Sequence, residues 1–190
     1  MDLRVEKTKG SIVNAFLSLR ARKPLEKITV KELCQLARIN KSTFYTHYSD
    51  IFALSHALEG EVVEAILADI PHPERIFDNT EEFTRDLFRS CNARSAMIQT
   101  LFSGSREGRL IETLEAGLKE LAFQRRPEYR QDPASHIVLS FVIYGGYYAY
   151  RKNLGYGLEQ VVELVGRLSR QVGDFFPPGG EARPGQGQKM

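Results

Sequence analysis

Residues 39–50, INKSTFYTHYSD, gather side chains that form hydrogen bonds to anions. Ser42, Thr43 and Thr46 supply hydroxyls, and Lys41 adds a positive charge beside them. Such groups hydrogen-bond to phosphate oxygens or base edges, and a threonine methyl can pack against a thymine methyl. The chemistry that this segment favours is noncovalent recognition of a polyanion.

The same residues alternate between an apolar and a polar face if they form a short helix. Phe44 and Tyr48 are four residues apart, so they share the inner face of a helix that ends near Tyr48. The outer face and its flank then carry Lys41, Ser42, Thr43, Tyr45 and Thr46. The alternative interpretation is an ordinary solvated face over two core aromatic residues, and the preceding residues make DNA contact the better one.

Those preceding residues predict the elements that position the segment. Thr29 and Glu32 have the spacing of a capping box. The helix that they open has an apolar stripe of Val30, Leu33, Leu36 and Ala37. A three-residue turn, Arg-Ile-Asn, follows, and Asn40 can cap the next helix. A further helix over about 3–21 precedes both, so the first fifty residues have the spacing of a three-helix helix-turn-helix unit.

Charge is distributed unevenly along the 190 residues. Residues 1–50 hold ten basic and five acidic side chains, a net charge of +5, whereas residues 51–176 hold 14 basic and 18 acidic ones. A basic amino-terminal part on an acidic body is typical of a polyanion-binding head. Scatter of a few charges is the alternative explanation.

The rest of the chain shows helical periodicity and no useful β-period. We expect an all-α fold of about nine helices: a head over 1–50, a helical body over 51–176 and a disordered tail over 177–190, which is rich in Pro, Gly and Gln. The body helices are predicted near 50–66, 80–93, 95–103, 105–124, 134–152 and 158–176, and the prolines of 71–80 interrupt the pattern.

Several classes of function lack their signals. No signal peptide is visible, and the longest apolar run, residues 137–150, is too short to cross a bilayer. Cys34 and Cys91 are lone cysteines, which fits a reduced cytoplasmic protein. No catalytic triad, phosphate loop, paired carboxylates or metal-ligand spacing is apparent. We therefore expect no enzyme, no cofactor, no metal site and no membrane association.

Residues 28–54, ITVKELCQLARINKSTFYTHYSDIFAL, resemble the DNA-binding head of TetR-family transcriptional regulators. The family's recognition helix ends in a Thr-Phe-Tyr-x-His-Phe pattern, and Thr43, Phe44, Tyr45, His47 and Tyr48 occupy it here. The resemblance implies a cytoplasmic homodimer that binds a near-palindromic site on double-stranded DNA, as a repressor released by a small-molecule inducer. Beyond residue 54 it extends only to architecture.

The resemblance also implies roles for individual residues. Phosphate contacts would come from Thr29, Tyr45 and His47, and contacts to bases or backbone from Lys41, Ser42, Thr43 and Thr46. Phe44 and Tyr48 would anchor the recognition helix in the core of the head.

Two positions depart from the family's pattern. Arg38 stands where the family has a turn glycine, and a positive φ there would cost about 1 kcal/mol. Arg38 could instead add a phosphate contact. Ile51 stands where the family usually has a lysine, so one phosphate contact would be missing and the salt dependence of binding shallower by about one charge.

The resemblance places a ligand pocket and a dimer interface in the body. Candidate pocket residues on its central helices are Phe88, Cys91, Met97, Phe102 and Tyr144, although plain core packing is the better explanation for each of them. The paired glycines of the apolar helix suggest close approach of another helix, from a second copy or from the same subunit. The predicted dimer interface comprises Gly145, Gly146, Val161, Val165 and Leu168.

Two alternatives keep the observations but change the function. One is a ligand-independent DNA-binding regulator or co-activator whose body binds a protein partner; it would need no cavity in the body. The other is a helical enzyme or lipid carrier with an incidental helix-turn-helix, which a buried pair of titratable groups in the body would favour.

Overall fold

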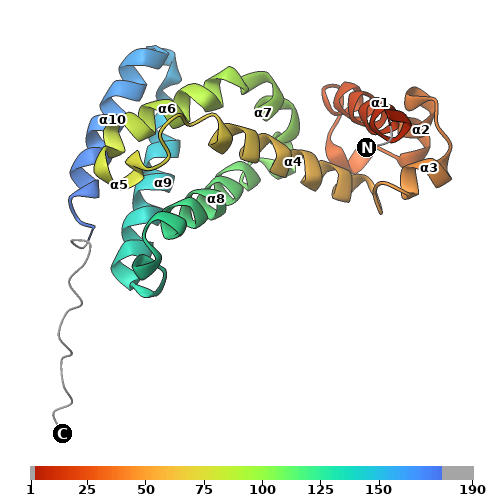
Figure 1. Cartoon of the computed structure of the whole chain (residues 1–190). Helices are drawn as coiled ribbons and strands as arrows, with labels where there is room; N and C mark the ends of the chain where they lie inside the picture. The colour runs from red at the N-terminus through yellow and green to blue at the C-terminus, as the bar shows by residue number, and fades with distance from the viewer. Residues whose placement is uncertain (1–2, 177–190) are drawn as a thin grey trace, which may run out of the picture. The chain divides into compact units, whose positions relative to one another are not determined.

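The computed structural model describes residues 3–176, apart from the side chain of Arg4. Over this range the chain is all-helical, with ten α-helices and no strand, which confirms the predicted fold class (Figure 1). The α-helices are α1 (Leu3–Arg20), α2 (Val30–Ala37), α3 (Lys41–Tyr45), α4 (Ile51–Ala68), α5 (Arg75–Asp78), α6 (Thr80–Ala93), α7 (Ser95–Leu101), α8 (Arg109–Arg125), α9 (Pro133–Asn153) and α10 (Leu158–Gly173). Short 3-10 helices are η1 (Leu25–Lys27), η2 (Gly104–Arg106), η3 (Pro127–Gln131) and η4 (Leu154–Tyr156). The predicted tail, 177–190, lies outside the described residues.

Two helices differ from the prediction. The proline-rich segment after α4 contains α5, whose four residues are too few to show a helical periodicity. The predicted recognition helix stops at Tyr45 instead of Tyr48, as β-branched and aromatic residues favour. Its turn continues nevertheless, because the backbone N–H groups of His47 and Tyr48 bond to the carbonyl of Phe44 at 2.9 and 3.0 Å.

The chain forms two compact units. The first contains the described residues up to Pro71 together with Asp86–Gly117, and the second contains His72–Arg85 and the described residues from Leu118 onward. The boundary predicted at residue 50 therefore falls inside the first unit, where α1, α2 and α3 lie with α4 and α7.

The helices α1, α2 and α3 of the head lie together (Figure 1). The fully buried apolar side chains of the head are Ile12 and Phe16 of α1, Leu25 of η1, Leu33 of α2 and Phe44 of α3. The predicted stripe on α2 needs one correction, since Leu36 is 52% exposed and Cys34 is buried instead. An eight-residue helix turns one face to α1, and Cys34 lies beside Leu33 on that face.

In the second unit, α10 packs against α9 and against the start of α6. Gly166 makes the second approach possible, because a Cβ there would lie 3.0 Å from the backbone oxygen of Glu81. At Gly173 a Cβ would lie 3.0 Å from the hydroxyl of Thr80. Close helix approach within the chain therefore occurs at these glycines and not at Gly145, where a Cβ would meet nothing within 4 Å.

Within the described part of the chain, no helix is both long and apolar enough to cross a membrane. The same residues contain no group of three or more His, Cys, Asp and Glu side chains that could hold a metal ion.

Candidate nucleic-acid interface

The turn between α2 and α3 has the predicted length, residues 38–40. Arg38 ends α2 in the left-handed conformation, with φ 56° and ψ 44°, and its backbone N–H bonds to the carbonyls of Cys34 and Gln35. A residue in this conformation is what closes a helix and redirects the chain. The positive φ expected from the family's glycine is therefore present, carried by an arginine.

Thr29 caps α2 as predicted, because its hydroxyl oxygen accepts a hydrogen bond from the backbone N–H of Glu32 at 3.2 Å. The carboxylate of Glu32 accepts a hydrogen bond from the ammonium of Lys23 instead of completing the capping box. Thr29 is exposed, and its hydroxyl hydrogen is free of any described partner, so it can donate outward.

Asn40 organises the amino end of α3 through one atom. Its side-chain oxygen accepts hydrogen bonds from the Thr43 backbone N–H at 2.8 Å and from the Ser42 and Thr43 hydroxyls at 2.7 Å. The hydroxyl of Thr46 donates to the carbonyl of Thr43 at 2.7 Å. The hydroxyls of Ser42, Thr43 and Thr46 therefore donate their hydrogen bonds within the protein. Toward solvent they offer mainly lone pairs that can accept hydrogen bonds.

The aromatic residues divide between the core and the surface. Phe44 is fully buried, and the exposed ring of Tyr45 meets it edge-on, with centroids 5.5 Å apart. Tyr48 is partly buried, and its hydroxyl is enclosed without a hydrogen-bond partner among the described atoms. Burial raises the pKa of this hydroxyl above its ordinary value. His47 lies beside Tyr48, half-buried, with ring centroids 6.3 Å apart.

Most of the head's cations have no anionic partner. Six exposed lysine and arginine side chains form no hydrogen bond or ion pair with any described residue. They are Lys7, Arg22, Lys27, Lys31, Arg38 and Lys41. Ile51, the other departure from the family pattern, is 5% exposed at the start of α4 and belongs to the core.

Long-range polar contacts fasten the head to other parts of the first unit. The buried guanidinium of Arg20, at the end of α1, donates to the carbonyl of Ser103 at 2.8 Å, and Glu26 accepts from the hydroxyl of Ser105. In α4, Glu59 is 2% exposed. It accepts two hydrogen bonds from Arg106, at 2.9 and 2.5 Å, and one from Ser55 at 2.8 Å. Sequence reasoning missed these residues, because their partners lie up to 83 positions away.

The predicted pocket residues do not form one group in either unit. Phe88, Cys91 and Phe102 are buried in the first unit, and Met97 in the same unit is 38% exposed. Tyr144 belongs to the second unit. Burial raises the pKa of the Cys91 thiol to about 12, so this thiol is unreactive near neutral pH.

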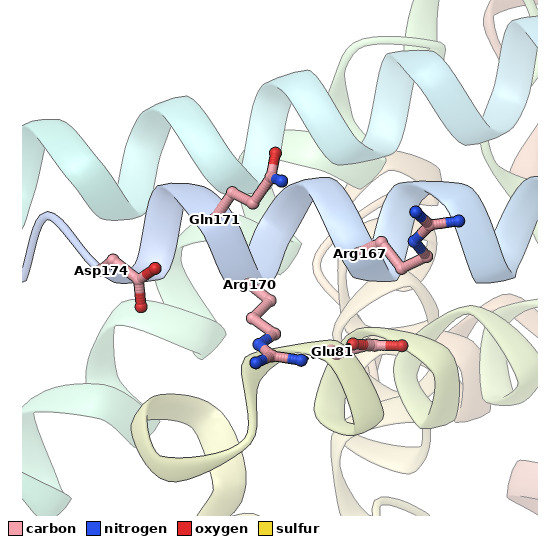
Figure 2. Close-up of a pocket in the computed structure, with 5 residues that line it drawn as sticks. All are labelled: Glu81, Arg167, Arg170, Gln171 and Asp174. Carbon is pink, nitrogen blue, oxygen red and sulfur yellow. Dashed lines mark ion pairs between the residues drawn. The ribbon is translucent and has the colours of Figure 1, made fainter.

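A hollow of about 500 Å³ opens instead on the second unit. It is lined by Glu81, Arg167, Arg170, Gln171 and Asp174. Figure 2 shows that Arg170 reaches toward Glu81, with 3.7 Å between nitrogen and oxygen, whereas Gln171 points to the other side of α10. The lining side chains do not converge on one point.

The predicted dimer residues fall on two sides of their helices. Val161 and Val165 are 6% and 5% exposed and face the core of the second unit, whereas Leu168 is 51% exposed and Gly145 is open. Leu164 on α10 is exposed too, and the prediction overlooked three exposed apolar residues on α9, namely Ile137, Phe141 and Tyr148. The available signal was their spacing along α9, which is apolar on all sides.

Comparisons with protein-family models, with curated proteins and with solved structures found no match.

Proposed function

We propose that this protein is a dimeric, DNA-binding transcriptional regulator of TetR type that acts as a repressor. The observation that carries the proposal is the turn at residues 38–40, which joins α2 to an α3 whose inner ring, Phe44, is buried and whose surroundings hold unpaired cations. In helix-turn-helix proteins the second helix enters the major groove, about 12 Å wide, while the first crosses the backbone.

The proposal divides the work among named residues. Lys41 and Tyr45 contact DNA directly, because both are exposed and neither side chain donates a hydrogen bond within the described residues. Thr29 and His47 contact phosphates at the edges of the same surface. Ser42, Thr43 and Thr46 act mainly as acceptors, for example toward the amino groups of bases, because their hydrogens are already donated. Phe44 and Tyr48 hold α3 in place.

A second copy of the chain is the proposed partner of the second unit. The exposed row of Ile137, Phe141 and Tyr148 on α9 would be covered in a homodimer, as would Leu164 and Leu168 on α10. Gly145 lies in the same helix as the first row, and its open Cβ position would admit a partner helix. Two heads would then address half-sites about 34 Å apart on a near-palindromic operator.

Release from DNA follows if a small molecule stabilises an arrangement of the heads that does not fit the operator. Within the first unit, the contacts of Arg20 with Ser103 and of Arg106 with Glu59 are the mechanical links that such a change would use.

Selection from a randomised pool of duplex DNA tests the proposal. We expect enrichment of a near-palindromic sequence. If each protomer places three to five of its unpaired cations on phosphates, the dimer makes about 6–10 contacts and loses about 10³–10⁵ of its affinity between 50 and 200 mM salt. Failure to enrich any sequence would overturn the proposal.

Substitutions then test the assigned surface. Lys41→Ala and Tyr45→Ala should weaken binding to the selected duplex. Arg125→Gln, which removes an exposed charge at the end of α8, is the matched control and should leave binding unchanged. Equal effects of all three changes would contradict the assignment of α3.

A ligand-independent regulator, whose body binds a protein partner, is the second candidate. The hollow on the second unit favours it, because its lining is charged and divergent, whereas small-molecule sites are mainly apolar with convergent polar groups. Retention of the selected duplex in the presence of diverse small molecules, with capture of a specific protein partner, would favour this candidate over a ligand-released repressor.

The pair Glu59–Arg106 bears on the enzyme alternative, since it joins a buried carboxylate to a guanidinium that is 20% exposed. Hydrogen bonding to Glu59 raises the pKa of the Arg106 guanidinium, so this guanidinium keeps its proton. Both carboxylate oxygens of Glu59 accept from Arg106, and neither residue lines the hollow. This arrangement is typical of a structural ion pair and does not favour catalysis.

A further inference from the structure

Arg38 occupies a backbone conformation that its side chain does not favour. Its φ of 56° makes it the one non-glycine residue with positive φ among residues 3–176. The left-handed conformation crowds the Cβ atom of any L-residue against the backbone, and glycine avoids this clash. The hydrogen bonds that close α2 come from the backbone N–H of Arg38, so glycine would serve the turn equally well.

No described contact of the Arg38 side chain compensates for this backbone strain. The guanidinium of Arg38 is exposed and forms no hydrogen bond or ion pair within the described residues. Arg20 in the same head is the opposite case, because it is buried and donates to the carbonyls of Lys23 and Ser103. Strain that brings no contact inside the protein directs attention to a contact outside it.

The surroundings of Arg38 are short of free hydrogen-bond donors. The hydroxyls of Ser42 and Thr43 donate to the side-chain oxygen of Asn40, and the hydroxyl of Thr46 donates to the carbonyl of Thr43. Arg38 and Lys41 lie on either side of Asn40 in the sequence and keep all of their side-chain donors. An anion that approaches this turn would therefore meet these two cations first.

We infer that Arg38 is a DNA-binding residue whose guanidinium contacts a phosphate beside the groove that α3 enters. The inference rests on the proposed function and extends it. A phosphate is the expected target because Arg38 belongs to the end of α2, the helix that crosses the backbone in helix-turn-helix complexes. The planar guanidinium can also bind a phosphate with two parallel hydrogen bonds. The position would then trade stability of the turn for one more contact to DNA.

The test compares Arg38→Gly with the unaltered full-length protein on a labelled duplex that the protein selects from a randomised pool. Glycine removes both the charge and the strain, so the thermal unfolding midpoint should rise while DNA affinity falls. The salt slope of binding should become shallower by about 0.9 for each protomer, or about 1.8 for a dimer. The unaltered protein should bind the duplex more tightly than Arg38→Gly, and the ratio of the two affinities should fall about tenfold between 50 and 200 mM salt.

Three further variants make the result specific. Arg38→Asn removes the charge but tolerates the left-handed conformation, so it should repeat the loss of salt slope if the glycine variant misfolds. Arg38→Lys keeps the charge and should keep the slope. Arg125→Gln removes one charge elsewhere and should change neither slope nor affinity.

The outcomes separate the two proposals. If the unaltered protein selects no sequence, the proposed function fails and this inference fails with it. If the protein binds its selected duplex and Arg38→Gly and Arg38→Asn retain its affinity and salt slope, the inference is overturned while the proposed function stands. A loss of the same size on scrambled duplex DNA is expected, because a phosphate contact carries no base information.

Discussion

The head and the second unit treat their charged side chains in opposite ways. Most arginines in the described part of the second unit form ion pairs with acids, including Arg75 with Glu82 at 2.6 Å and Arg130 with Glu120 at 3.0 Å. In the head, six exposed cations have no described partner. Exposed ion pairs add little to stability, so fold stability does not account for the difference. The difference supports the proposal that the head binds an anion that the chain itself does not supply.

Apolar side chains show the reverse pattern. In the head, Ile12, Phe16, Leu33 and Phe44 are fully buried, although Leu36 is 52% exposed, whereas α9 and α10 expose a row that includes Phe141 at 65% and Leu168 at 51%. Each region thus leaves uncovered the type of surface that its proposed partner would cover. DNA phosphates suit the head, and the hydrocarbon surface of a second copy suits α9 and α10.

The largest effect is expected from a change in the exposed apolar surface of α9. Phe141→Glu places a charge in the exposed row of α9 and should convert the dimer to a monomer in sedimentation velocity. Loss of the second head should lower affinity for the selected duplex by about 10²–10⁴-fold, because binding of the two heads is no longer linked.

Gln99→Glu is the control for that variant, since it adds the same charge to an exposed position of α7. It should leave both the dimer and DNA binding unchanged. A dimer that survives Phe141→Glu would refute the assignment of this surface.

The ion pair of Glu59 and Arg106 in the first unit should contribute more to the free energy of unfolding than the exposed pair of Glu120 and Arg130 in the second unit. Arg106→Ala leaves the 2%-exposed carboxylate of Glu59 with Ser55 as its described hydrogen-bond partner. Removing one partner of a buried pair costs about 3–5 kcal/mol. Chemical denaturation should show that loss for Arg106→Ala and little change for Arg130→Ala, whose partner Glu120 is exposed. Equal losses would contradict the expected dependence on burial.

The smallest expected effect compares two helix caps of similar geometry. Asn40 accepts from the Thr43 N–H and two hydroxyls, and Asp132 accepts from the N–H and hydroxyl of Ser135 at 2.7 and 2.6 Å. Asn40→Ala and Asp132→Ala should each lower the free energy of unfolding by about 1 kcal/mol.

DNA binding should distinguish these two caps. Asn40→Ala also frees the hydroxyl hydrogens beside α3, so it alone should change affinity for the selected duplex. An equal change in DNA affinity for Asp132→Ala and Asn40→Ala would contradict the role of Asn40 at the DNA-binding surface.

Local chemistry made much of the fold predictable from the sequence. Thr29 and Asn40 cap helices because a short polar side chain next to an apolar run satisfies free backbone N–H groups. In these cases the cause lies within a few residues of the effect. A positive φ at Arg38 was considered only because the family that this segment resembles has a glycine at that position.

The parts that could not be predicted depend on residues far apart in the sequence. Nothing near Glu59 indicates that Arg106 lies against it, and nothing near Arg20 indicates the carbonyl of Ser103. Periodicity likewise could not separate the covered from the open side of α9, because the helix is apolar all round. On α10, the predicted interface residues Val161 and Val165 are 6% and 5% exposed within the chain, whereas the predicted Leu168 is 51% exposed.

The anchoring of Arg20 has a practical consequence for anyone who wishes to exchange binding heads between proteins of this architecture. Arg20 ends α1, yet it donates to the carbonyls of Leu101 and Ser103, and Glu26 accepts from Ser105. A graft that ended at residue 50 would carry a buried guanidinium without these acceptors. The portable piece is therefore discontinuous: it must include residues 101–105 along with the first three helices, so a chimera needs three splice points rather than one.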